Sequence, residues 1–296
     1  MIILISFVIL HYLVADETIQ CVDSILANVE GKISIIVVDN SSPNSSFSEL
    51  CEHYTKNKRV FLIKNSFNSG YASGINFGYN FAKKKFNPDF IVAMNNDMTI
   101  LQSDFCKKII DIFNRTNFFV LGPDIYSTET KKHQNPENHT IITLQEVNQE
   151  ISNIKRSQSQ RFTLGLKSLL RKSILIQKTY YKGKRLLKHY HYINHELDNI
   201  TLHGSCYIFS RKFIIARGYA LYPKTTFYCE AQILDYECKR DGMKQIYSPE
   251  ISIQHHEDIA TNAAEGGYYQ KMNMKYERTL ESLKIFKELI LKDQRK

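Results

Sequence analysis

The chain has 296 residues, of which 43% are hydrophobic and 12% aromatic, and its formal net charge at pH 7 is +9. This composition excludes an intrinsically disordered protein and leaves enough apolar residues for one large domain or two small ones. The six cysteines occur singly, without a CxxC pair. That pattern argues against a disulfide framework or a zinc site and favours the reduced environment of the cytosol.

Short apolar runs alternate with helical patterns from the first residue to residue 121. The opening run lacks a basic leader and a cleavage site and is too short to span a bilayer, so we expect a buried first strand. We predict strands at 2–10, 33–38, 60–63, 90–94 and 118–121, and helices at 16–28, 45–54, 70–84 and 103–113. This alternation is typical of βαβ units and of a mostly parallel sheet flanked by helices.

The middle of the chain has a different composition. From 127 to 199 it becomes polar and rich in Asn and Lys, which we interpret as a variable insertion. The insertion contains an amphipathic helical pattern at 162–174 and a basic block, 151–190, with eleven Lys or Arg and no Asp or Glu. Such a block is typical of a solvated helical hairpin or of a surface for an anionic partner. The neighbouring apolar stripe favours an anionic membrane surface over nucleic acid.

Regular patterns return after the insertion. We predict strands at 206–210 and 251–254, a helix at 230–240 and a long C-terminal helix at about 266–291. A single domain spanning 1–296 accommodates all of these elements.

Polar side chains follow two of the predicted buried strands. Asp39 follows the strand 33–38, and Asn96-Asp97 comes soon after the strand 90–94. In a parallel sheet the carboxyl ends of the strands share one edge, and ligands collect there. Amide and carboxylate oxygens suit Mg²⁺ or Mn²⁺ holding a diphosphate. Asn and Asp after a strand are also ordinary turn residues, so this pattern alone leaves both interpretations open.

Other residues near this edge suit a nucleotide. Tyr12 would stack on a nucleobase, or it is an aromatic residue at the boundary of the core. Asp39 would accept hydrogen bonds from a base or ribose, or it caps its own loop. Gly70, Gly74 and Gly78 recur at every fourth residue. That spacing leaves a bare helix face for a ligand or for close packing on a strand.

Several segments, taken in order, resemble family 2 glycosyltransferases. The matching blocks are FVILHYL at 7–13 with TIQCVDSIL at 18–26, IVVDNSS at 36–42, NSFNSGYASGINFG at 65–78, NND at 95–97, LHGSC at 202–206, TFYCEAQIL at 226–234, and YSP at 247–249 followed by His255. The resemblance implies the GT-A (nucleotide-diphospho-sugar transferase) fold, with a mixed, mostly parallel sheet. It is to the branch that builds bacterial surface polysaccharides, including rhamnosyltransferase-like enzymes.

The resemblance also implies which residues form the site. It assigns the nucleotide to Tyr12, Asp39, Asn68, Gly70, Gly74 and Asn96, the cation Mn²⁺ or Mg²⁺ to Asp97 and His255, and the donor-sugar or acceptor pocket to Gly204 and Ser205. His255 is equally compatible with a structural role at the end of a strand.

The general base is the point at which the chain departs from the family. Two adjacent acids open the corresponding family helix, and the second is credited with deprotonating the acceptor; here the pair is Glu230-Ala231. Alanine cannot accept a proton, so Glu230 is the remaining candidate, and a helix N-terminus favours its ionised form. Alternatively Glu230 only caps the helix, and the chain is a non-catalytic nucleotide- or membrane-binding partner subunit.

The function implied by the resemblance is that of an inverting, metal-dependent hexosyltransferase. The donor would be a UDP- or dTDP-sugar, and the acceptor a hydroxyl of a glycan linked to a polyprenyl lipid. We therefore expect a cytoplasmic protein, bound peripherally to the inner face of the plasma membrane.

Overall fold

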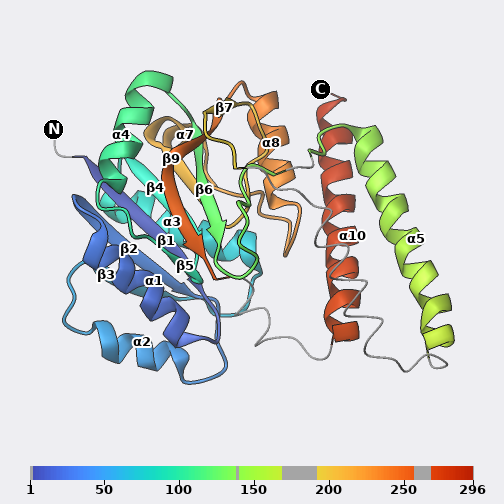
Figure 1. Cartoon of the computed structure of the whole chain (residues 1–296), viewed down its shortest axis with the longest axis horizontal. Helices are drawn as coiled ribbons and strands as arrows, with labels where there is room; N and C mark the ends of the chain where they lie inside the picture. Colours follow the sequence, from blue (N-terminus) through green and yellow to red (C-terminus); the bar gives the residue numbers. More distant parts are fainter. Residues whose placement is uncertain (1–2, 138–139, 169–191, 257–267, 296) are drawn as a thin grey trace.

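The computed structural model of the chain describes residues 3–137, 140–168, 192–256 and 268–295. In these ranges nine strands form one sheet with helices packed on both faces (Figure 1). The strands are β1 (Leu4–His11), β2 (Lys32–Asp39), β3 (Val60–Lys64), β4 (Phe90–Asn95), β5 (Met98–Thr99), β6 (Val120–Ser127), β7 (Leu197–Asp198), β8 (Cys206–Ser210) and β9 (Gln245–His255). The helices are α1 (Ala15–Asn28), α2 (Ser46–Tyr54), α3 (Tyr71–Phe86), α4 (Phe105–Thr116), α5 (Leu144–Ser168), α7 (Arg211–Ala216), α8 (Glu230–Arg240) and α10 (Tyr268–Asp293).

The strand order is β3-β2-β1-β4-β8-β6-β9-β5, and β7 pairs with β9. Strands β1 to β4 run parallel, whereas β8 is antiparallel to both β4 and β6. The register places His11 beside Asp39 and Leu10 beside Asn95, so the carboxyl ends of β1, β2 and β4 lie at one edge. The predicted mixed, mostly parallel sheet flanked by helices is confirmed.

The apolar runs are continuous because both faces of the sheet are covered. In β1, Phe7 and Ile9 belong to the core under α1 and α4, whereas Val8 belongs to the core under α3. Each face excludes water, so polar alternation would leave unpartnered groups inside. The glycines of α3 fit this packing: a Cβ on Gly74 would lie 2.5 Å from Leu10 Cδ1. Close helix–strand contact thus accounts for the spacing, and nucleotide binding by Gly74 stays a prediction.

Helices α5 and α10 lie side by side at one end of the molecule, and α10 also contacts α8 (Figure 1). Their shared apolar core contains Val147 and Ile154 from α5, Ile233 from α8, and Leu283 and Phe286 from α10. The helix expected at 162–174 therefore begins much earlier, at Leu144. The remainder of that pattern and most of the basic block lie outside the described residues. None of the described helices combines the length and hydropathy that crossing a bilayer requires.

Candidate active site

A buried histidine joins the ends of β1 and β4. His11 Nδ1 lies 2.7 Å from Thr18 Oγ1, and its Nε2 lies 2.9 Å from Ser46 Oγ. Burial lowers the pKa of His11 to about 4, so the ring is neutral at pH 7. Asn96 Nδ2 donates to the same Thr18 oxygen at 2.9 Å. These contacts fix Asn96 at the sheet edge, one residue before the predicted metal ligand.

Asp39 is fully buried at the end of β2. Its carboxylate accepts a hydrogen bond from the Ser42 backbone N–H at 3.1 Å and pairs with Lys64 Nζ at 3.4 Å. This is the loop-capping arrangement that the sequence left open. The side chain of Tyr12 is partly exposed beside the same loop. The nucleotide contacts predicted for Tyr12 and Asp39 stay predictions.

The loop before α3 is organised by Asn40, which sequence reasoning did not select. Asn40 Nδ2 donates to Asn68 Oδ1 at 3.0 Å and to the Gly70 carbonyl at 3.2 Å. Gly70 has φ 82° and ψ −179°, a region of the backbone map that is essentially restricted to glycine. A Cβ on Gly70 would lie 2.4 Å from the Thr226 carbonyl oxygen. The glycine thus lets this loop approach the segment that leads into α8.

Asp97 and His255 come together although they are far apart in the chain. Met98, the next residue after Asp97, pairs with His255 across β5 and β9. Asp97 is only 5% exposed, and its Oδ1 lies 3.3 Å from His255 Nε2. Gln134 Oε1 lies 2.6 Å from the other ring nitrogen, Nδ1. With that oxygen as acceptor, Nδ1 carries a proton, and Nε2 faces Asp97.

This pair of donors fits a divalent cation. Asp97 Oδ1 is buried without a hydrogen-bond partner among the described residues. A carboxylate oxygen and an imidazole nitrogen suit Mn²⁺, and the carboxylate also suits Mg²⁺. Within the described ranges no group of three or more His, Cys, Asp or Glu could hold a metal ion.

Glu230 opens α8 and is 7% exposed. Burial raises its pKa from the ordinary 4.5 to about 7, while backbone amides at Glu230 and Tyr228 act in the opposite direction. The backbone amides at the helix N-terminus thus favour the ionised form, as expected from the sequence, but desolvation outweighs them. Its Oε1 has no hydrogen-bond partner in the part of the chain that the structure describes.

Tyr71, at the start of α3, lies within electrostatic range of both Glu230 and Asp97. Its hydroxyl donates to the Gly204 carbonyl at 2.8 Å. Burial, and then the nearby Glu230 and Asp97 among other groups, raise the pKa of Tyr71 well above its usual range. Both carboxylates therefore act on one phenol, which places Glu230 and Asp97 around a common region. The Tyr207 hydroxyl lies there too, 3.7 Å from the position of a Cβ on Gly204.

The loop before β8 lies beside the predicted metal ligands. Ser205 Oγ lies 2.8 Å from His203 Nδ1, and the His203 and His255 ring centroids are 6.2 Å apart. Burial lowers the pKa of His203 to about 4, so this ring is also neutral at pH 7. The structure thus brings Gly204 and Ser205 close to Tyr71 and His255.

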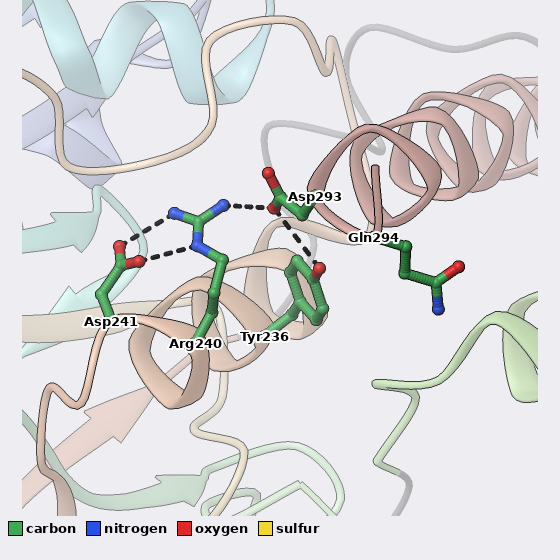
Figure 2. Close-up of a pocket in the computed structure, with 5 residues that line it drawn as sticks. All are labelled: Tyr236, Arg240, Asp241, Asp293 and Gln294. Carbon is green, nitrogen blue, oxygen red and sulfur yellow. Dashed lines mark hydrogen bonds and ion pairs between the residues drawn. The ribbon is translucent and has the colours of Figure 1, made fainter. Parts of the chain in front are cut away.

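Ala231 stands where the family has a second acid, and Asp235 of α8 does not replace that acid. Asp235 is fully buried, and its carboxylate accepts from Thr201 Oγ1 at 2.6 Å and from Lys239 Nζ at 2.9 Å. It is therefore engaged away from Glu230. A surface hollow at the far end of α8 is lined by Tyr236, Arg240, Asp241, Asp293 and Gln294 (Figure 2). The charged groups of this hollow pair with one another, so it does not contribute to the candidate site.

A mixed sheet whose polar edge gathers an Asp-His pair and a buried glutamate is the arrangement expected of a GT-A glycosyltransferase. The chain belongs to glycosyl transferase family 2, whose family model matches residues 6–177. No curated protein sequence matched the chain.

Solved structures share its fold. The crystal structure of GalNAc-T7 with UDP, GalNAc and Mn²⁺ has a TM-score of 0.55 and 12% identity, covering 86% of this chain and 44% of that one. The crystal structure of S. aureus TarS 1–349 in complex with UDP has a TM-score of 0.51 and 11% identity, covering 85% and 60%. The chain thus spans about half the length of the structures that it matches, and the likeness establishes the GT-A fold.

Proposed function

We propose that this glycosyltransferase moves one hexose from a UDP- or dTDP-sugar to a hydroxyl of a lipid-linked glycan, with inversion and with Mn²⁺ or Mg²⁺ as cofactor. The observation that supports this most strongly is the placement of Asp97 and Glu230 around Tyr71, with His255 3.3 Å from Asp97. Two proteins of the same fold were crystallised with UDP, one of them also with Mn²⁺.

Asp97 and His255 are the residues that would hold the cation. A bound cation neutralises negative charge on the diphosphate as it departs, which lowers the barrier to transfer. Gln134 fixes the tautomer and the orientation of the His255 ring. Tyr12, Asp39 and Asn96, with the loop at 68–70, are the proposed nucleotide contacts.

Glu230 is the proposed general base. With a pKa of about 7, the carboxyl is ionised in about half of the molecules at pH 7, and the ionised form has high affinity for a proton. In a single displacement the acceptor oxygen forms a bond to the anomeric carbon while the bond to the diphosphate oxygen breaks. Glu230 takes the proton of the acceptor hydroxyl in the same step. Gly204 and Ser205 are the proposed wall of the sugar pocket.

The basic block supports the proposed acceptor and location. Lys155 and Arg156 are exposed on α5, while Ile154 between α5 and α10 is buried. Each basic residue near an anionic membrane contributes about 1 kcal/mol to binding. We therefore propose that the chain is one GT-A domain, 1–296, that acts at the cytoplasmic face of the plasma membrane on a polyprenyl-linked acceptor.

A thermal-shift screen of UDP-, dTDP- and GDP-sugars, with and without Mn²⁺, tests the proposal, because a specific ligand raises Tm by mass action. Stabilisation by one donor only with Mn²⁺ is expected. Asp97→Ala should abolish that stabilisation, whereas Glu230→Gln should keep it and lose transfer. Absence of a shift for every donor would refute the function.

The second candidate function is a non-catalytic partner subunit, which Ala231 in place of the usual acid favours. Donor binding at full stability, with no transfer across a library of glycan acceptors, would identify this alternative.

A further inference from the structure

We infer that α10 positions the catalytic base: Ser282 binds the Phe227 carbonyl and fixes the backbone that enters α8, and so it sets the location of Glu230. This inference rests on the proposed role of Glu230 and adds a residue outside the segment that matches the family, 6–177.

The segment 226–229 has an unfavourable backbone. Tyr228 has φ 70° and Cys229 has φ 65°, in the left-handed region that residues with side chains seldom adopt. The two residues are consecutive and lead directly into Glu230. A segment of this kind keeps its conformation only when the surrounding structure holds it.

Two helices that are far apart in the sequence, α3 and α10, hold this segment. From the start of α3, the Tyr71 N–H donates to the Thr226 carbonyl at 2.8 Å. From α10, the fully buried Ser282 donates its Oγ hydrogen to the Phe227 carbonyl at 2.7 Å. The segment is thus fixed at two successive carbonyl groups.

Two cations of α10 extend the contact along the same helix face. The Arg278 guanidinium lies 4.5 Å from the centroid of the Phe227 ring, and Lys275 Nζ lies 5.5 Å from that of Tyr228. Residues 275, 278 and 282 follow the three- and four-residue spacing of one helical face. This face of α10 therefore covers Phe227 and Tyr228.

Separate contacts hold α10 itself in place. The Phe286 ring packs edge-on against Tyr236 of α8, with centroids 5.4 Å apart, and Asp293 pairs with Arg240 (Figure 2). These contacts lie toward the opposite end of α8 from Glu230. The Arg240–Asp293 pair provides a matched control, because it fastens α10 to the end of α8 that is remote from Glu230.

Loss of the hydrogen bond from Ser282 to Phe227 would release the backbone segment that keeps Glu230 buried. Among the described residues, the titratable groups whose pKa values Glu230 perturbs are Tyr71 from α3, Tyr207 from β8 and the adjacent Cys229. None of these brings a positive charge, so desolvation dominates the carboxyl. A relaxed segment would admit water to Glu230 and return its pKa toward 4.5. It would also move the carboxylate away from the acceptor.

The test compares Ser282→Ala, Ser282→Thr and Asp293→Asn in the full chain. The Glu230 pKa is followed by NMR of protein labelled with ¹³C-glutamate, with Glu230→Gln to assign the signal, and kcat and nucleotide Kd are measured in parallel. Ser282→Ala should lower the Glu230 pKa from about 7 toward 4.5 and reduce kcat at least tenfold, with the nucleotide Kd unchanged. Ser282→Thr, which keeps the hydroxyl, should retain both values.

Asp293→Asn should lower Tm but leave the Glu230 pKa and kcat unchanged. The inference is overturned if Ser282→Ala titrates and turns over like the wild type, or if Asp293→Asn causes the same losses. Should Ser282→Ala fail to fold, Lys275→Met, at an exposed position on the same face of α10, should shift the Glu230 pKa by a smaller amount in the same direction. An unchanged pKa would overturn the inference. Equal transfer by Glu230→Gln and wild type would refute the proposed base instead, whatever the NMR titration shows.

Discussion

Replacing Gly70 by alanine should destabilise the protein for two separable reasons. The conformation at φ 82° and ψ −179° costs a residue with a Cβ about 1–3 kcal/mol. The new methyl group would also lie 2.4 Å from the Thr226 carbonyl oxygen, and relieving such an overlap costs about 1–3 kcal/mol. Together they predict a loss of about 2–6 kcal/mol, or a fall in Tm of roughly 3–10 °C for a chain of 296 residues.

Two other glycines separate these causes. Gly242 has φ 64° but no atom within 4 Å of an added Cβ, so Gly242→Ala should cost only about 1–2 kcal/mol. Gly218 has neither constraint, and Gly218→Ala should stay within about 0.5 kcal/mol of the wild type. Urea denaturation of the three variants gives the comparison. A Gly70→Ala variant no less stable than Gly242→Ala would refute the close contact between the α3 loop and the segment leading to Glu230.

Three further predictions concern buried polar side chains. The folded-state pKa of Glu230, about 7, lies above the ordinary 4.5, so the wild-type free energy of unfolding falls as the pH rises from 4.5 through 7. Glutamine does not ionise, so Glu230→Gln should be more stable than the wild type by up to about 3 kcal/mol at pH 8. Urea denaturation should show that this advantage is lost at pH 4. The Arg217–Glu237 pair is buried, so Glu237→Ala should cost about 3–5 kcal/mol, and a loss below 1 kcal/mol would contradict this pairing. Gln134→Ala, which frees the His255 ring, should weaken Mn²⁺ binding about 10–100-fold by calorimetry, and unchanged affinity would contradict its orienting role.

The sequence predicted the elements whose apolar pattern is continuous. Strand Cys206–Ser210 and helix Glu230–Arg240 have the predicted bounds. Strand β9 was predicted only from 251, because Pro249 and Glu250 interrupt the apolar run where the β6–β9 register shifts. The two-residue strands β5 and β7 and the six-residue helix α7 were missed, since elements this short have no periodicity to detect.

One helix start that was missed did leave a signal. Helix α5 begins at Leu144, and Thr143 and Glu146 form a reciprocal capping box: the Glu146 N–H donates to Thr143 Oγ1 at 3.2 Å, and the Thr143 N–H to Glu146 Oε2 at 2.8 Å. The spacing T-x-x-E is the sequence signature of such a box. The polar composition of the insertion concealed it, because α5 buries only one apolar face, mainly against α10.

The candidate site was predicted less completely than the fold. Asp97 and His255 were selected from motif order, but their proximity depends on the pairing of β5 with β9. Tyr71, Gln134 and Ser282 were missed, because each acts through a contact with residues remote in sequence. The raised pKa of Glu230 was missed for a related reason: burial is a property of the folded chain, whereas a helix N-terminus is visible in the sequence.

The most direct test of the proposed cation site is pulsed electron paramagnetic resonance of Mn²⁺ bound to the protein together with UDP. We expect ³¹P coupling from the diphosphate and ¹⁴N coupling from an imidazole on the same ion, with the nitrogen coupling absent in His255→Ala and Mn²⁺–UDP binding absent in Asp97→Ala. Coupling to phosphorus without nitrogen in the wild type, or a spectrum unchanged by both substitutions, would contradict it.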